Sequence, residues 1–174
     1  MPVKFVFNNR MLDLWMLFHQ TYNSLFKCGE KELAKLGITT QQYVILMTIN
    51  NGGEMTTPTQ LADWLDRNAN SITLIIDRME KAGLVKRVRD VSDRRSLRIV
   101  LTDKGGNILN KGTKIAWELI QNLLSGFSDK EMQNMINQMV KLRSEAISRC
   151  YTDKTVKDLR IDLKGMPGIT GKAD

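Results

Sequence analysis

The stretch TPTQLADWLDRNANSITLIIDRMEKAGLVKRVRDVSDRRSLRIVLT, residues 57–102, decides the fold of this chain. It opens with a helix-start signal: Thr57 is the cap residue, Pro58 takes the first helical position and Gln60 the third. After a break at residues 67–69, a second helical segment carries apolar residues at helical spacing and stops at Gly83. Two short helices joined by a tight turn form a helix-turn-helix.

A basic β-ribbon is predicted directly after these helices. Leu97, Ile99 and Leu101 alternate with other residues at period two, which is typical of a half-buried strand. The ribbon makes the motif a winged helix-turn-helix. Its six basic side chains are Lys86, Arg87, Arg89, Arg94, Arg95 and Arg98. Guanidinium groups on a ribbon suit a polyanion, because they fork onto phosphate or enter a narrow groove. Taken alone, the stretch fits a solvated surface hairpin equally well.

The whole chain has 174 residues, enough for one domain with an extension, and a formal net charge of +7. This charge favours acidic partners, with nucleic acid first. The longest apolar stretches, such as residues 14–18, are far shorter than a membrane span, and the N-terminus lacks the pattern of a signal peptide. We therefore expect a cytoplasmic protein that does not associate with a membrane.

The residue types that carry most catalysis are scarce in this chain. It has one histidine, His19, and two cysteines, Cys28 and Cys150, which lie far apart without metal-ligand spacing. No serine, cysteine or carboxylate stands at a spacing from His19 that indicates a catalytic set. We expect neither an enzyme nor a bound metal or cofactor.

Helical segments are predicted on both sides of the winged segment. The helix over residues 9–35 is apolar around much of its circumference, which predicts that it is central or covered by a partner chain. A second helix opens at Thr39, and two more follow the ribbon, the first from Thr102 and the second from Ser128. The glycines Gly105, Gly106 and Gly112 are expected to weaken the first of these two helices, by roughly 1 kcal/mol each where interior.

The order of these elements, together with several short motifs, resembles the MarR family of transcriptional regulators. The resemblance covers about residues 9 to 150. The motifs that carry it are LGIT (36–39) with QY (42–43), LA (61–62), IDRMEKAGLV (76–85), DRRS (93–96) and LTDKG (101–105).

The resemblance implies a mainly α fold: a winged helix-turn-helix with a two-stranded β wing and long N- and C-terminal dimerisation helices. Residues 1–36 and 103–150 would form the dimerisation region, and residues 37–102 the DNA-binding lobe. Residues 151–174 are interpreted as a partly ordered tail. The implied function is sequence-specific regulation of transcription on double-stranded DNA, as a ligand-responsive homodimeric repressor that binds an inverted repeat. A winged-helix protein-interaction module and a thiol-based redox sensor at Cys28 or Cys150 remain the alternatives.

Two sets of residues are expected to read the DNA. On the recognition helix they are Asn70, Ser71, Thr73, Leu74 and Arg78, and on the wing they are Asp93, Arg94 and Arg95. The resemblance places Arg95 in the minor groove, oriented by Asp93, with Arg94 on phosphate. Asp93 also fits a simple turn former, and Asn70 a local helix cap. Arg87, Arg89 and Arg98 are interpreted as phosphate or solvent contacts.

Leu74 departs from the arginine that many relatives carry at this position. Leucine cannot hydrogen-bond guanine, so it either packs on a thymine methyl or turns inward.

The resemblance also implies an effector site between the dimerisation helices and the lobe. The candidate lining residues for a small hydrophobic effector are Trp15, His19, Tyr22, Phe26, Tyr43 and Met47. The same residues suit core or dimer contacts.

Overall fold

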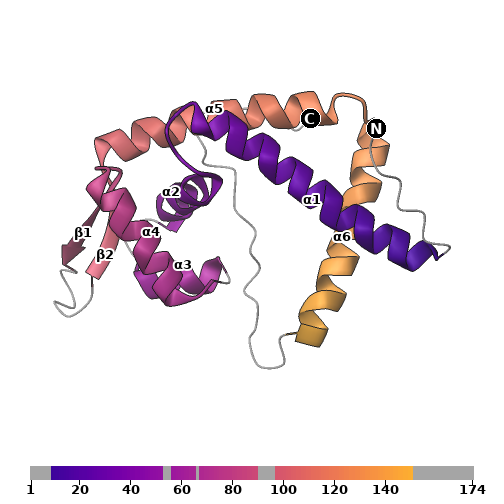
Figure 1. The fold of residues 1–174 in the computed structure, drawn as a ribbon, viewed down its shortest axis with the longest axis horizontal. Coiled ribbons are helices and arrows are strands. Elements are labelled where there is room, and N and C mark those ends of the chain that lie inside the picture. Colours follow the sequence, from indigo (N-terminus) through magenta and orange to yellow (C-terminus); the bar gives the residue numbers. More distant parts are fainter. Residues whose placement is uncertain (1–8, 53–55, 66, 90–96, 151–174) are drawn as a thin grey trace.

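The computed structural model describes residues 9–52, 56–65, 67–89 and 97–150, with the side chain of Cys150 excepted. Within these ranges the chain forms helices and one two-stranded sheet (Figure 1). The helices are α1 (Arg10–Ala34), α2 (Thr40–Gly52), α3 (Pro58–Trp64), α4 (Ala69–Lys81), α5 (Asp103–Leu124) and α6 (Asp129–Cys150). The strands are β1 (Val85–Arg89) and β2 (Leu97–Leu101), which pair antiparallel. The predicted mainly α, winged helix-turn-helix fold is confirmed.

The helix boundaries follow from local signals in the sequence. Thr57 accepts a hydrogen bond from the Gln60 N–H at 3.2 Å, while the Gln60 side chain accepts from the Thr57 N–H at 2.9 Å, so the predicted capping box is present. Thr39 and Gln42 make the same reciprocal pair before α2. Gly83 ends α4 with φ +71°, a left-handed conformation that residues with a Cβ disfavour.

A single core lies in what we call the lobe: α2, α3, α4, β1 and β2, closed by Leu33 of α1 and Leu109 of α5. Its innermost side chains include Leu46, Leu61, Ile76 and Ile99, each fully buried. The other members are Ile38, Tyr43, Ile45, Ile49, Ala62, Ile72, Met79, Leu84 and Val85. The helix-turn-helix is therefore held by apolar packing rather than by helix propensity.

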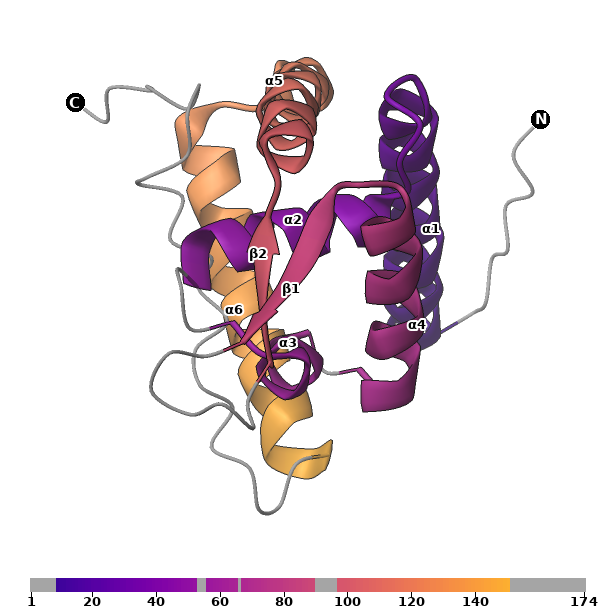
Figure 2. The same cartoon turned by 90° about the vertical axis from the view of Figure 1, so that its left-hand side faces the viewer.

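The remaining helical parts extend away from the lobe. We call residues 10–25 and 120–149 the helical arm. Among its described side chains none is buried, and α6 makes only sparse contacts with the other described elements. In Figure 1 α6 lies on the side of the molecule opposite the β-ribbon, and in Figure 2, viewed from the ribbon side, it lies behind the ribbon. None of the described helices combines the length and apolar character needed to cross a membrane.

One expectation from the sequence needs correction and another is extended. Ile99 is fully buried and Leu101 partly so, but Leu97 is 45% exposed, so the core does not cover the first residue of β2. Two glycines of α5, besides being weak helix formers, lie where the helix packs closely against other residues. A Cβ at Gly105 would lie 1.9 Å from the Leu84 carbonyl oxygen, and one at Gly112 would lie 2.9 Å from the Tyr43 ring. Both positions allow α5 to lie directly against the lobe.

Candidate nucleic-acid interface

The start of α4 is capped by Asn68, which leaves Asn70 available. The Asn68 side-chain oxygen accepts from the Asn70 N–H at 2.8 Å. The Asn70 side chain is exposed and is not the cap, so the alternative of a local capping role does not hold. The exposed Asn70 amide therefore lies at the N-terminal end of α4. In a recognition helix this is the end that contacts base edges.

The buried stripe of α4 turns its opposite face to solvent. Ile72, Ile76 and Met79 are buried in the lobe core. The exposed side chains are those of Asn70, Ser71, Thr73, Leu74, Arg78 and Lys81. The structure therefore brings all the recognition-helix residues expected from the sequence onto one exposed side of one helix.

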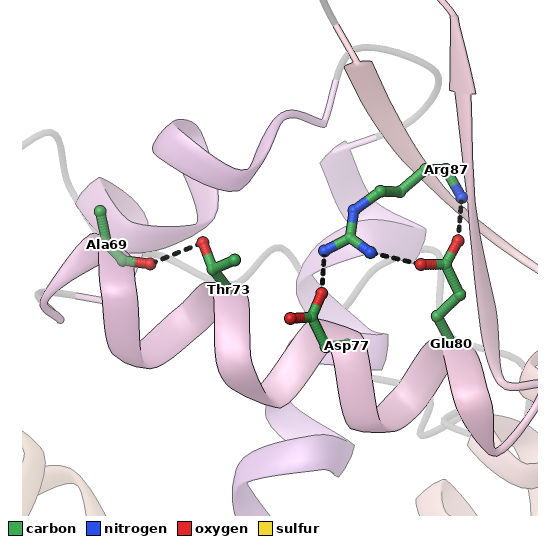
Figure 3. Close-up of polar contacts among 5 residues, drawn as sticks. All are labelled: Ala69, Thr73, Asp77, Glu80 and Arg87. Carbon is green, nitrogen blue, oxygen red and sulfur yellow. Dashed lines mark hydrogen bonds and ion pairs between the residues drawn. The ribbon is translucent and has the colours of Figure 1, made fainter.

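The Thr73 hydroxyl, although exposed, already donates its hydrogen bond within α4. The acceptor is the Ala69 carbonyl oxygen, at 2.9 Å (Figure 3). With its single proton used inside the helix, the oxygen keeps only its acceptor capacity. A partner at this position must supply a donor.

Leu74 does not turn into the core. Its side chain is 59% exposed in the middle of the solvent face of α4. The inward alternative is excluded, and an apolar group is presented where its neighbours are polar.

The wing begins as a regular antiparallel ladder. Val85 pairs with Leu101, Arg87 with Ile99 and Arg89 with Leu97. The Ile99 N–H also donates to the Thr56 carbonyl oxygen at 2.8 Å, which fixes β2 to the residues just before α3. The expected wing residues Asp93, Arg94 and Arg95 lie outside the described residues.

Arg87 is engaged with two carboxylates of α4, which corrects its interpretation as a phosphate or solvent contact. Its guanidinium donates to Asp77 through one nitrogen and to Glu80 through another, and its backbone N–H donates to Glu80 Oε1 at 3.0 Å (Figure 3). Hydrogen bonding to Asp77 is the main cause that raises the Arg87 pKa, although partial burial opposes it. The sequence did not identify Glu80 as a partner of Arg87, because the two residues lie seven positions apart on different elements.

The candidate effector residues fall into two places. Trp15 stacks edge-on to His19 at 5.1 Å between ring centroids, and Tyr22 lies 6.0 Å from Phe26, all along α1. Tyr43 and Met47 belong instead to the lobe core or pack against it. Tyr43 donates a hydrogen bond to Thr113 Oγ1 at 3.2 Å, and burial raises its pKa against the opposing effect of that bond.

A helix-turn-helix with an exposed second helix and an adjoining β-ribbon defines the winged-helix class of fold, in which the second helix is the element that enters the major groove of DNA in DNA-binding members. The family model for the MarR family matches residues 38–97. An HTH-type transcriptional regulator of Bacillus subtilis is 32% identical over 117 residues, covering 67% of this chain and 80% of that protein.

Solved structures also share this fold, and two of them, each 24% identical in sequence to this chain, serve as examples. One is a mutant MarR from E. coli in complex with operator DNA, with a TM-score of 0.70, covering 77% of this chain and 96% of that one. The other is an organohalide-sensing transcriptional regulator with 2,4-dichlorophenol bound, with a TM-score of 0.72, covering 90% and 95%. The chain belongs to the MarR family, and it is a DNA-binding transcriptional regulator.

Proposed function

We propose that this protein is a homodimeric, ligand-responsive repressor that binds an inverted repeat in double-stranded DNA. The observation that carries the DNA part is the solvent face of α4, where Asn70, Ser71, Thr73 and Leu74 are exposed opposite a buried stripe. Phosphate contacts fix register while side chains at base edges give sequence preference, and this face has the chemistry for the second task. Asp93, Arg94 and Arg95 supply the minor-groove and phosphate contacts of the wing.

The homodimer is supported by the exposed apolar side chains of the helical arm. They include Trp15 at 59%, Ile136 at 54% and Met139 at 50% exposure. The others are Met11, Leu12, Leu14, Leu17, Tyr22, Leu25, Ile120, Leu123, Leu124, Met135, Val140 and Leu142, with Phe127 between α5 and α6. So many apolar side chains along unburied helices indicate an interface rather than ordinary surface. A second copy of the chain provides the matching surface under two-fold symmetry.

The effector part is supported by the aromatic side chains that α1 leaves unburied. Trp15, His19 and Tyr22 are exposed, and Phe26 is partly buried beside them. An aromatic or other hydrophobic molecule that binds along α1 on its side toward the lobe would contact these rings, and Tyr43 and Met47 would support the site from within the lobe. The organohalide-sensing regulator of similar fold holds such a molecule, 2,4-dichlorophenol.

Selection from a pool of random duplexes tests the DNA part of the proposal. The purified protein should enrich an inverted repeat with half-sites about one helical turn apart, and binding should weaken steeply with salt. A reporter driven from the selected site should fall in output when the protein is present. Enrichment of no sequence, or of a single asymmetric half-site, would contradict the proposal.

Leu74 gives this selection an internal check. Arginine at this position suits guanine, whereas leucine suits a thymine methyl. We expect Leu74→Arg to raise the guanine frequency at the facing base pair and to leave the other positions of the repeat unchanged. An identical base preference in the two proteins would show that this side chain does not read DNA.

A further inference from the structure

One arginine of the wing holds both carboxylates of the recognition helix. Asp77 and Glu80 stand three residues apart and so lie on the same side of α4. The two terminal nitrogens of Arg87 divide between them, and Glu80 also accepts from the Arg87 backbone N–H (Figure 3). The guanidinium fork is planar, so it orients both carboxylates at once.

The network ties two separate elements at the base of the ribbon. Arg87 is the central residue of β1 and pairs with Ile99, while Asp77 and Glu80 belong to the last two turns of α4. On the other strand, the Ile99 N–H is bound to the Thr56 carbonyl. The ribbon is therefore fixed to α4 through β1 and to the segment before α3 through β2.

The same network governs the charge that α4 presents. Asp77 and Glu80 are its acidic residues, and Arg78 and Lys81 its basic ones. The carboxylate side chains are 43% and 37% exposed, so without Arg87 they would face water near any bound duplex. Unpaired carboxylates at this place would repel phosphate.

We propose that Arg87 is a positioning residue for DNA recognition: it sets the angle between α4 and the wing and neutralises the two carboxylates, and it does not itself contact phosphate. This inference rests on the proposed function, because it assumes that α4 and the wing read one operator. The side chain of Arg87 is only 23% exposed, and each of its terminal nitrogens donates to a protein carboxylate, so it is poorly placed to contact a phosphate.

The test compares Arg87→Met with Arg89→Met on the selected operator and on a scrambled duplex. Arg89 lies on the same strand two residues further along, is exposed, and its substitution removes the same charge. We expect Arg89→Met to weaken binding to both duplexes by a similar factor. Arg87→Met should weaken operator binding by about tenfold more than scrambled binding, which is the penalty typical of one mismatched base pair in a specific site.

The opposite charge change separates positioning from simple electrostatics. Asp77→Asn with Glu80→Gln removes two negative charges, so general attraction to DNA rises, yet the fork is left without charged partners. We expect this double variant also to lower the ratio of operator to scrambled affinity. A ratio that stays unchanged while affinity for both duplexes rises would overturn the inference and assign Arg87 to phosphate.

Two controls keep the outcome decisive. Arg87→Lys keeps the charge without the fork, and we expect it to fold and to give an intermediate ratio, so it serves if Arg87→Met does not fold. The wild-type ratio is measured first. If the wild type prefers neither duplex, the proposed function fails. If it prefers the operator and Arg87→Met, Arg87→Lys and the double variant all keep its ratio, the inference alone fails.

Discussion

The lobe and the helical arm treat the same kinds of side chain in opposite ways. In the lobe, Ile76 is fully buried among side chains of α2, α3 and the wing, whereas Ile136 of α6 is 54% exposed. The lobe encloses its apolar residues within one chain, and the arm leaves them open. Burial of apolar surface drives both folding and association, so the lobe is closed within one chain, whereas the arm carries the apolar surface that the proposed homodimer would bury.

The most severe way to break this comparison is to place a charge in the open region. If α6 is covered by a second copy, Ile136→Glu should weaken the dimer by about 3–5 kcal/mol, because a carboxylate would be buried without a partner. Light scattering with size-exclusion chromatography should show a shift to monomer at micromolar concentration. Gln138→Glu on the same helix adds the same charge at a polar position and serves as the control. If the two variants have the same oligomeric state, a homodimer interface at Ile136 is contradicted.

Removing the same atoms from both regions sharpens the contrast. Ile76→Ala should lower the free energy of unfolding by about 2–5 kcal/mol, since it leaves a cavity in a closed core. Its effect should not depend on protein concentration when lobe unfolding is monitored by a local probe. Ile136→Ala should act through dimer dissociation, so its effect on the urea midpoint should be absent when both proteins are dilute monomers and should grow as the concentration rises through the dissociation constants of the dimers. Urea unfolding at two protein concentrations distinguishes the two variants. If the loss of stability is independent of concentration for both, the arm does not differ from the lobe in the way proposed.

The junction between lobe and arm offers a smaller effect. Gly105→Ala should cost about 1–3 kcal/mol, because its Cβ would lie 1.9 Å from the Leu84 carbonyl oxygen and α5 must shift away from the end of α4. Gly106→Ala is the matched control, since nothing lies within 4 Å of its Cβ. That neighbour should be neutral or stabilising by up to about 1 kcal/mol. Thermal unfolding of both variants measures the difference, and equal melting temperatures would show that the close approach is not maintained in solution.

The smallest expected effect is at the first turn of α6. The Ser128 hydroxyl, and secondarily its backbone N–H, hold the pKa of Glu131 below its ordinary value of 4.5. A carboxyl with a lowered pKa in the folded state stabilises above its unfolded pKa and loses that contribution as the pH falls through the folded one. The protection factors of the amides in the first turn of α6, which are exchange rates corrected for the intrinsic effect of pH, should therefore fall below pH 4.5 in the wild type. Glu131→Gln should remove this pH dependence, and an unchanged profile would contradict the capping role.

Local signals were sufficient for most of the helix boundaries. The capping pairs at Thr57 and Thr39 and the left-handed Gly83 act over three or four residues, so the sequence pattern contains all the partners involved. The exposed face of α4 was predictable for the same reason, since the positions of Ile72, Ile76 and Met79 fix the opposite side of a regular helix.

Interactions across elements could not be read in this way. Arg87 was interpreted as a phosphate or solvent contact, yet Asp77 and Glu80 reach it because α4 and β1 pack together. The exposure of Leu97 depends on how much of β2 the core covers, which the alternation of apolar residues does not show. The candidate effector residues were grouped by the crevice that the family resemblance implies, but the structure puts Tyr43 in the lobe core and Trp15 on an open helix.

The sequence by itself determined the order of the elements, their ends and the polar side of the recognition helix, because these depend on periodicity and on hydrogen bonds between near neighbours. Only the tertiary structure decided that Arg87 serves α4 and that Gly105 and Gly112 are sites of close approach. It alone also showed that the lobe is closed while the arm is open. Those properties depend on distances between residues far apart in the chain, which packing sets and local pattern does not.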